Sequence, residues 1–242
     1  FILEKSNFLK KIQIKKLSKF HVTWIDSLSK LENGPNIFLA NEFFDAQPIK
    51  QFIKKNNKWF EKKVKIINVD NFKLVNVMTN IKNLERKIGI NLSNNQNFIE
   101  FSPQTYKYLN IIAKKINTFK GGLLIIDYGY LEKKMKNSLQ SVHKHKFNKI
   151  FNNFGKSDIT HKVNFCLLKK IANKLNLKVA GLTTQNNFLT KLGIAQRAEL
   201  LTRNLQFSKK ADVYYRVKRL IDNKFMGELF KVMFLTKKKN KF

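Results

Sequence analysis

Four polar residues that could bind a cationic group directly follow, or lie just beyond, apolar segments of this sequence. One apolar run ends in Asn41 and Glu42, with Asp45 three residues later, and a second run ends in Asp127. Short apolar runs of this kind are typical of buried parallel strands, whose carboxyl ends form the ligand-binding edge of an open α/β sheet. Carboxylates grip a planar cation such as a guanidinium through paired, directional hydrogen bonds. The pattern also fits a strand followed by an ordinary acidic loop.

The elements around these residues alternate between short strands and helices, which predicts an α/β fold with a largely parallel sheet and crossover helices. Ser6 is a candidate N-cap for the first helix, and Ser102 with Pro103 begins another. Asp158 or Thr160 is a candidate cap before the helix that starts near Phe165. The predicted strands are Phe1–Leu3, His21–Ile25, Ile37–Asn41, Leu123–Ile126, Leu177–Leu182 and Leu229–Leu235. The predicted helices cover residues 6–18, 102–117, 165–175, 188–192, 197–205 and 211–221.

Three segments depart from this rhythm. Residues 50–87 carry partial two-residue alternation and predict a small antiparallel β insertion. Residues 130–156 are rich in lysine and predict a mobile loop or lid. Residues 237–242 form a basic tail without a folding signal. We expect residues 1–242 to form a single domain that includes the insertion.

The formal net charge of +32, from 48 Lys and Arg against 16 Asp and Glu, has two explanations. It could serve a polyanionic partner, either RNA or an anionic membrane surface. It could also reflect an AT-rich coding sequence, because lysine, asparagine, isoleucine and phenylalanine are all abundant. The lysines are spread along the whole chain rather than clustered, so we favour the compositional explanation.

Cysteine and histidine content limits the chemistry further. Cys166 is the single cysteine, so the chain contains no internal disulfide and no multi-cysteine metal site. His143 and His145 have chelating spacing but lie among lysines, and we predict no metal site there. No apolar run approaches the length of a membrane span. These features favour a reducing, soluble compartment.

Several segments, in order along the chain, resemble the MidA family of class I S-adenosylmethionine-dependent methyltransferases. The most specific is A-N-E-F-F-D-A-Q-P, residues 40–48, although the family usually has Leu where this chain has Gln47. The others are L-E-K-S (3–6), W-F-E-K-K-V (59–64), I-D-Y-G-Y (126–130), S-D-I-T (157–160), G-L-T-T-Q (181–185) and M-G-E-L-F-K-V (226–232). Together they span most of the chain.

The resemblance implies a Rossmann-like methyltransferase sheet and S-adenosylmethionine as cofactor. It implies a protein substrate, methylated on arginine and connected to assembly of respiratory complex I, in a bacterial cytoplasm or mitochondrial matrix. Glu4, at the end of a strand, would bond the ribose hydroxyls, with Asp26 and Ser27 near the adenine. Asn41, Glu42, Asp45 and Asp127 would be the catalytic set, with Asn41 orienting the methyl acceptor. The alternatives are a basic RNA-binding protein or an RNA methyltransferase.

Two departures from the family matter. Val163-Asn164-Phe165 stands where the family commonly has V-D-F, so an amide replaces a carboxylate. The glycine-rich first loop and the strand before it are absent, and we expect them to lie before residue 1 of an amino-terminally truncated domain. We therefore predict an open apolar slot in the sheet beside residues 37–41, weak or no binding of the cofactor by residues 1–242, and a tendency to aggregate.

Overall fold

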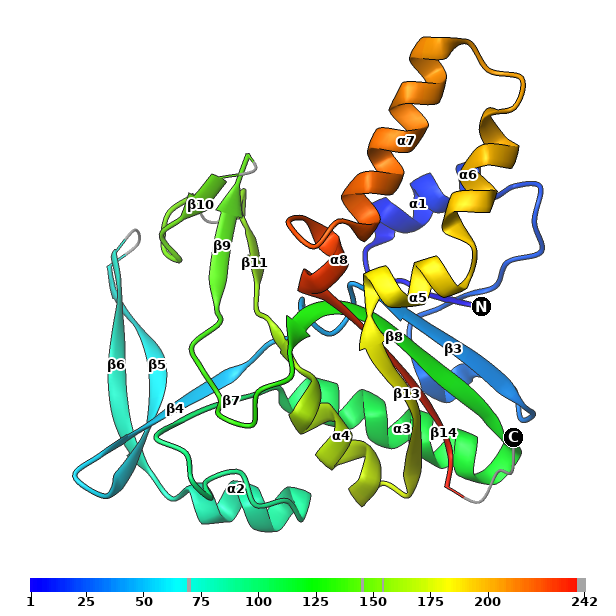
Figure 1. Ribbon diagram of the computed structural model, residues 1–242. Coiled ribbons are helices and arrows are strands. Elements are labelled where there is room, and N and C mark those ends of the chain that lie inside the picture. Colours follow the sequence, from blue (N-terminus) through cyan, green and yellow to red (C-terminus); the bar gives the residue numbers. More distant parts are fainter. Residues whose placement is uncertain (69–70, 145, 154, 239–242) are drawn as a thin grey trace.

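A five-stranded sheet forms the centre of the protein in a computed structural model that describes residues 1–68, 71–144, 146–153 and 155–238. The long strand β8 pairs with β3 and β12 along one edge and with β14 along the other, and β13 follows β14 (Figure 1). Strands β3 and β12 run parallel to β8, whereas β14 is antiparallel to both of its neighbours. The bounds are β3 Asn36–Asn41, β8 Gly121–Tyr130, β12 Val163–Asn164, β13 Leu177–Thr184 and β14 Phe230–Lys237.

Helices α3 (Pro103–Phe119) and α4 (Phe165–Lys174) cover one face of this sheet (Figure 1). Ser102 caps α3 as predicted, because its Oγ accepts the Thr105 N–H at 3.0 Å. The predicted cap of α4 is wrong. Asn164, rather than Asp158 or Thr160, accepts the Leu167 N–H at 3.0 Å. The core between helices and sheet contains Leu109, Ile112, Ile116, Leu123, Ile125, Phe165, Ile171 and Met233.

The first two strands do not join the central sheet, which agrees with the predicted open slot beside residues 37–41. Strand β1 (Ile2–Leu3) pairs in parallel with β2 (Trp24–Ile25), and among the described residues it pairs with no other strand. Helix α1 (Asn7–Lys16), capped by Ser6 as predicted, and the 3-10 helix η1 (Leu28–Lys30) flank this pair. A cavity of about 410 Å³ separates β1 from β3, so the predicted slot is present.

The predicted antiparallel insertion is confirmed in its first part. Strands β4 (Lys50–Lys55), β5 (Lys58–Asn68) and β6 (Asn71–Thr79) form it, together with a strand that sequence reasoning missed, β7 (Phe98–Phe101). Residues 81–87 were predicted within the same β insertion but belong to helix α2 (Ile81–Ile88), which Asn80 caps and Gly89 ends in the left-handed region.

The predicted loop over residues 130–156 is also corrected. Tyr130 ends β8, and β9 (Gln140–His143) and β10 (Lys146–Asn148) form a three-stranded antiparallel sheet with β11 (Asp158–Thr160). This sheet and the β5–β6 hairpin project from the same side of the central sheet (Figure 1). Each is only two or three strands wide, and lysines between the apolar residues weaken its sequence signal.

A set of four helices lies on the side of the molecule opposite the β5–β6 hairpin, near the carboxyl ends of β8 and β13 (Figure 1). They are α5 (Gln185–Lys191), α6 (Ile194–Thr202), α7 (Phe207–Ile221) and α8 (Met226–Leu229). Within the described residues, none of the helices has the length and apolar character needed to cross a bilayer. Of the predicted basic tail, Lys237 belongs to β14, and residues 239–242 lie outside the described part of the chain.

Candidate active site at the carboxyl ends of the strands

Asp127 fixes the turn that follows β3. Its side chain is fully buried, and its Oδ2 accepts hydrogen bonds from the backbone N–H groups of Phe44, at 3.0 Å, and Asp45, at 3.3 Å. Its Oδ1 accepts the N–H of Tyr128 at 3.0 Å. A carboxylate that accepts three backbone N–H groups holds the surrounding chain in one conformation, because each group would otherwise be buried unpaired. Asp127 therefore positions residues 44 and 45 next to the end of β8.

Asp45 and Asp127 form a buried pair of carboxyl groups. Burial and, after it, the neighbouring Asp45 carboxylate raise the pKa of Asp127 to about 7, although the three backbone hydrogen bonds act to lower it. Asp45 is also buried, and its Oδ1 has no hydrogen-bond partner among the described residues. The predicted meeting of Asp45 and Asp127 is thus present.

Asn41 and Glu42 lie at the same end of β3 but face solvent. Asn41 is opposite Ile126 in the β3–β8 register, and the Glu42 N–H continues the ladder to the Ile126 carbonyl at 2.9 Å. Glu42 has a φ of +46°, in the left-handed region that non-glycine residues seldom adopt. The chain turns sharply at this residue, and the Glu42 side chain is exposed while that of Asp127 is fully buried. The structure therefore divides the predicted catalytic set into an exposed pair and a buried pair.

Residues from the end of β8 and from β9, β11 and the residue after β11 complete the surroundings of Asp45. The Tyr128 hydroxyl lies among Thr160, Asp45 and Gln140, and its pKa is raised first by burial and further by the Asp45 carboxylate. The backbone N–H of His161 donates to the Asp45 carbonyl at 3.1 Å. Sequence reasoning missed these residues. Tyr128 and Thr160 lie within the motifs I-D-Y-G-Y and S-D-I-T, which was the signal that could have pointed to them.

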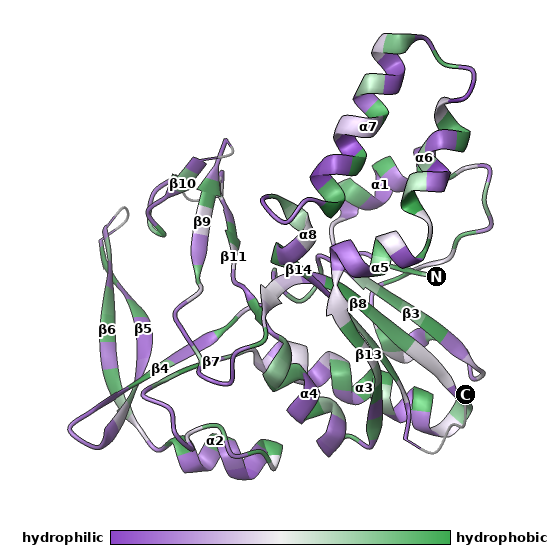
Figure 2. Ribbon diagram, in the orientation of Figure 1, coloured by the Kyte–Doolittle hydropathy of each residue, from purple (hydrophilic) through white to green (hydrophobic). Residues whose placement is uncertain are grey.

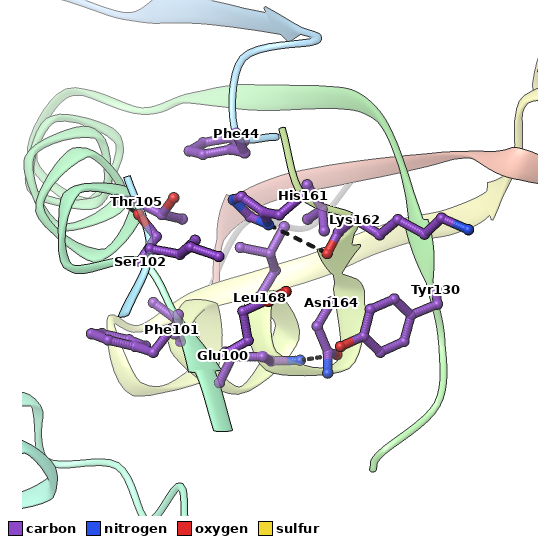
Figure 3. Close-up of a pocket in the computed structure, with 14 residues that line it drawn as sticks. Phe44, Glu100, Phe101, Ser102, Thr105, Tyr130, His161, Lys162, Asn164 and Leu168 are labelled. Atoms are coloured by element: carbon purple, nitrogen blue, oxygen red, sulfur yellow. Dashed lines mark hydrogen bonds between the residues drawn. The ribbon is translucent and has the colours of Figure 1, made fainter. Parts of the chain in front are cut away.

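A small buried pocket lies beneath Phe44, behind the Asp45 turn (Figure 3). Ser102, Thr105 and His161 line its upper part in the figure, and Glu100, Tyr130 and Asn164 its lower part. Its volume of about 40 Å³ is sufficient for a water molecule. Two polar atoms of its lining, His161 Nε2 and Thr105 Oγ1, are buried without a partner in the described structure. The pocket therefore offers buried polar atoms within a mainly apolar lining, and it is too small for a nucleoside.

The three predicted cofactor residues lie together at the ends of β1 and β2. The Glu4 N–H donates to the Ile25 carbonyl at 3.2 Å, which places Glu4 beside Asp26. The Glu4 carboxylate accepts the Ser6 N–H at 2.8 Å and the Gln13 amide at 2.9 Å. Asp26 is exposed and pairs with Lys30 at 2.8 Å, and its pKa is lowered by the hydrogen bond to that lysine. Ser27 caps η1.

Aromatic contacts connect this cluster to the turn after β3. The Lys5 ammonium lies 5.7 Å from the centre of the Tyr108 ring on α3. The Phe43 ring packs edge-on against Tyr108, with ring centres 5.0 Å apart, and against Phe44 at 5.2 Å. The residue after Glu4 and the residue after Glu42 therefore contact the same tyrosine. The carboxyl ends of β1 and β3 face one region.

The described residues fit one end of S-adenosylmethionine. A carboxylate such as Glu4 retains lone pairs that could accept ribose hydroxyls. The side chains that line the slot between β1 and β3 are almost all apolar, among them Ile2, Leu3, Ile25, Phe38, Leu39 and Leu123. Such walls do not suit a sulfonium or an amino-acid carboxylate, since a buried charge needs a partner. The nucleoside end thus has candidate ligands here, whereas the methionine end has none in this slot.

The fold and the arrangement of strand ends are those of an α/β protein of the class I methyltransferase type. The chain belongs to the family described as "Putative S-adenosyl-L-methionine-dependent methyltransferase", whose model matches residues 1–183. This confirms the resemblance to the MidA family that the motifs indicated.

Relatives and solved structures agree with this assignment. Protein arginine methyltransferase NDUFAF7 of Danio rerio is 29% identical over 86% of this chain and 49% of its own length, and the Caenorhabditis elegans homolog is 31% identical over 78% and 44%. The chain thus spans about half the length of these relatives. A crystal structure from Burkholderia thailandensis with bound S-adenosyl-homocysteine matches 98% of this chain and 63% of its own, at 22% identity and a TM-score of 0.77. This structural similarity establishes a shared fold.

Proposed function

We propose that this chain provides the acceptor side of an S-adenosylmethionine-dependent methyltransferase that modifies arginine in a protein substrate. The observation that carries the proposal is the exposed pair Asn41 and Glu42 at the carboxyl end of β3, next to the turn at residues 44 and 45 that the buried Asp127 holds. The relatives from Danio rerio and Caenorhabditis elegans, which are named as protein arginine methyltransferases, support the same activity. The basic RNA-binding alternative has no comparable support in the site.

In the mechanism, each residue has a separate role. When bound, S-adenosylmethionine supplies an electrophilic methyl group. The Glu42 carboxylate accepts hydrogen bonds from the N–H groups of a guanidinium and favours electron density on the attacking nitrogen. The Asn41 amide orients the same group from the adjacent position. Asp127 is a positioning residue, because its oxygens are taken by backbone N–H groups. Asp45, with one free carboxyl oxygen beneath the turn, completes the negative field.

The test is Glu42→Gln in the full-length protein, with cofactor binding measured beside methyl transfer. The change keeps the size and removes the charge, so we expect methyl transfer to fall about 100-fold while the Kd for the cofactor stays within twofold. Transfer to an arginine peptide is followed by mass spectrometry. Glu32→Gln, an exposed glutamate before β3, is the matched control and should leave transfer unchanged. Transfer by Glu42→Gln within a few-fold of wild type would remove Glu42 from the mechanism.

We propose further that the substrate is a subunit of respiratory complex I and that the protein works in the mitochondrial matrix or in a bacterial cytoplasm. The complex I assignment rests on the resemblance to the MidA family. The mitochondrial setting is also supported by these relatives, which are named as mitochondrial proteins. Methylation of isolated complex I subunits, read by mass spectrometry, tests the substrate directly.

A further inference from the structure

Helices α6 and α7 form a hairpin that projects away from the sheet (Figure 1). Half-buried residues at helical spacing on α7, namely Val213, Val217 and Leu220, form its inner side. In the described structure, none of the fifteen residues of α7 is fully buried. The hairpin also lies beyond residue 183, where the match to the family model ends. It is therefore an outlying element that the proposed active site does not use.

The outer surface of this hairpin is apolar and aromatic. Phe207, the first residue of α7, is 87% exposed, and Leu200 and Leu201 near the end of α6 are 59% and 54% exposed. Tyr214 and Tyr215 are also exposed and follow Phe207 by seven and eight residues, which places all three rings on one side of the helix. Figure 2 shows apolar residues at the end of the hairpin that lies farthest from the sheet.

The same hairpin is strongly basic. Residues 194–221 contain seven Lys or Arg and two acidic residues. One of these acids, Asp212, is already paired with Arg216 at 2.7 Å. Arg203 is two positions from the exposed Leu201, and Lys209 and Lys210 are two and three positions from the exposed Phe207. An apolar tip bordered by cations is the combination found in helices that lie in the interface of an anionic bilayer.

We propose that the α6–α7 hairpin docks the protein on an anionic membrane surface. Phe207, Leu200 and Leu201 enter the boundary between headgroups and acyl chains. Tyr214 and Tyr215 lie at the headgroup level, where their apolar rings and polar hydroxyls are both accommodated. Arg203, Lys209 and Lys210 contact the lipid phosphates. Charge complementarity argues for this occupant, because a purely ionic partner would leave the exposed Phe207 and leucines without a role.

The experiment measures sedimentation of the protein with vesicles at physiological ionic strength. One set is phosphatidylcholine alone and the other contains phosphatidylglycerol. We expect binding only to the anionic vesicles. The double variant Leu201→Ser/Phe207→Ser should bind about tenfold or more weakly, because two apolar side chains no longer insert. Phe147→Ser is the matched control, since Phe147 is 82% exposed on β10 and should change binding less than twofold.

Comparing the double variant with Phe147→Ser separates insertion of apolar side chains into the bilayer from electrostatic attraction between the vesicles and a chain of net charge +32. Anionic binding that both variants retain would mean that charge alone acts, and it would overturn the proposal. Equal binding to phosphatidylcholine, or no binding to either vesicle, would also overturn it. Tight binding of poly(U) RNA, equal for the wild type and the double variant, together with no binding to vesicles, would overturn the proposal in favour of an RNA partner. Since these readouts involve no methyl transfer, their failure leaves the proposed activity untouched.

Discussion

At the scale of single residues, two opposing effects act on the pKa of Asp127. Three backbone N–H groups favour its ionised form, while complete burial and the nearby Asp45 disfavour it, and the balance raises its pKa to about 7. An unfolded aspartate titrates near 4. The folded state therefore holds more protons than the unfolded state between pH 4 and pH 7. The free energy of unfolding contributed by this group falls as pH rises through that window and is constant above it.

This balance predicts the effect of Asp45→Asn. Removing the like charge should lower the pKa of Asp127 from about 7 by roughly one unit, since burial remains as the larger cause. The carboxyl carbon shift of Asp127, followed by NMR between pH 4 and pH 9, measures it. Glu132→Gln changes an exposed acid that pairs with Lys136 and should leave the Asp127 titration in place. An unchanged pKa in Asp45→Asn would show that the two groups are not coupled.

At the scale of elements, the N-cap of α4 explains the departure at position 164. Asparagine and aspartate are comparable N-caps, so the amide retains the hydrogen bond to the Leu167 N–H. We expect Asn164→Ala to lower the free energy of unfolding by about 1 kcal/mol and Asn164→Asp to leave it equal or slightly higher, because a negative charge suits a helix N-terminus. Urea denaturation of the three proteins measures both. A stable Asn164→Ala would contradict the capping role.

The elements also show how far sequence reasoning reaches. Strands β3, β8, β13 and β14 were predicted because they are apolar runs that end at polar or turn residues. The roles of Glu42 and Asp127 could not be separated, since both follow such a run and only the turn places one outside and one inside. Strands β9 to β11 were missed because their pairing partners are set by tertiary context rather than by a strong local pattern. The close pairing of β12 with β8 depends on Gly129, because the Cβ of any other residue at this position would lie 2.1 Å from the Val163 carbonyl oxygen.

At the scale of the whole molecule, the most consequential feature is the open slot between β1 and β3. Strand β3 is paired on one side only among the described residues, and its Ile37 and Leu39 side chains are 77% and 68% exposed. An exposed apolar strand edge offers unpaired backbone groups to other chains. The slot is lined by Leu3 and Phe43, the neighbours of Glu4 and Glu42. We therefore expect that filling the slot would also fix the strand ends that carry these two carboxylates.

We expect residues 1–242 alone to bind S-adenosylmethionine weakly or not at all and to self-associate through this edge. Isothermal calorimetry measures the first, and sedimentation velocity over a range of concentrations measures the second. Ile37→Lys/Leu39→Lys should reduce self-association, because charged side chains oppose edge-to-edge pairing. Phe147→Lys, at an equally exposed site away from the slot, should reduce it much less. Tight cofactor binding by residues 1–242 would show that the open slot does not prevent binding. Equal self-association of both lysine variants would show that the edge of β3 is not the surface through which the chains associate.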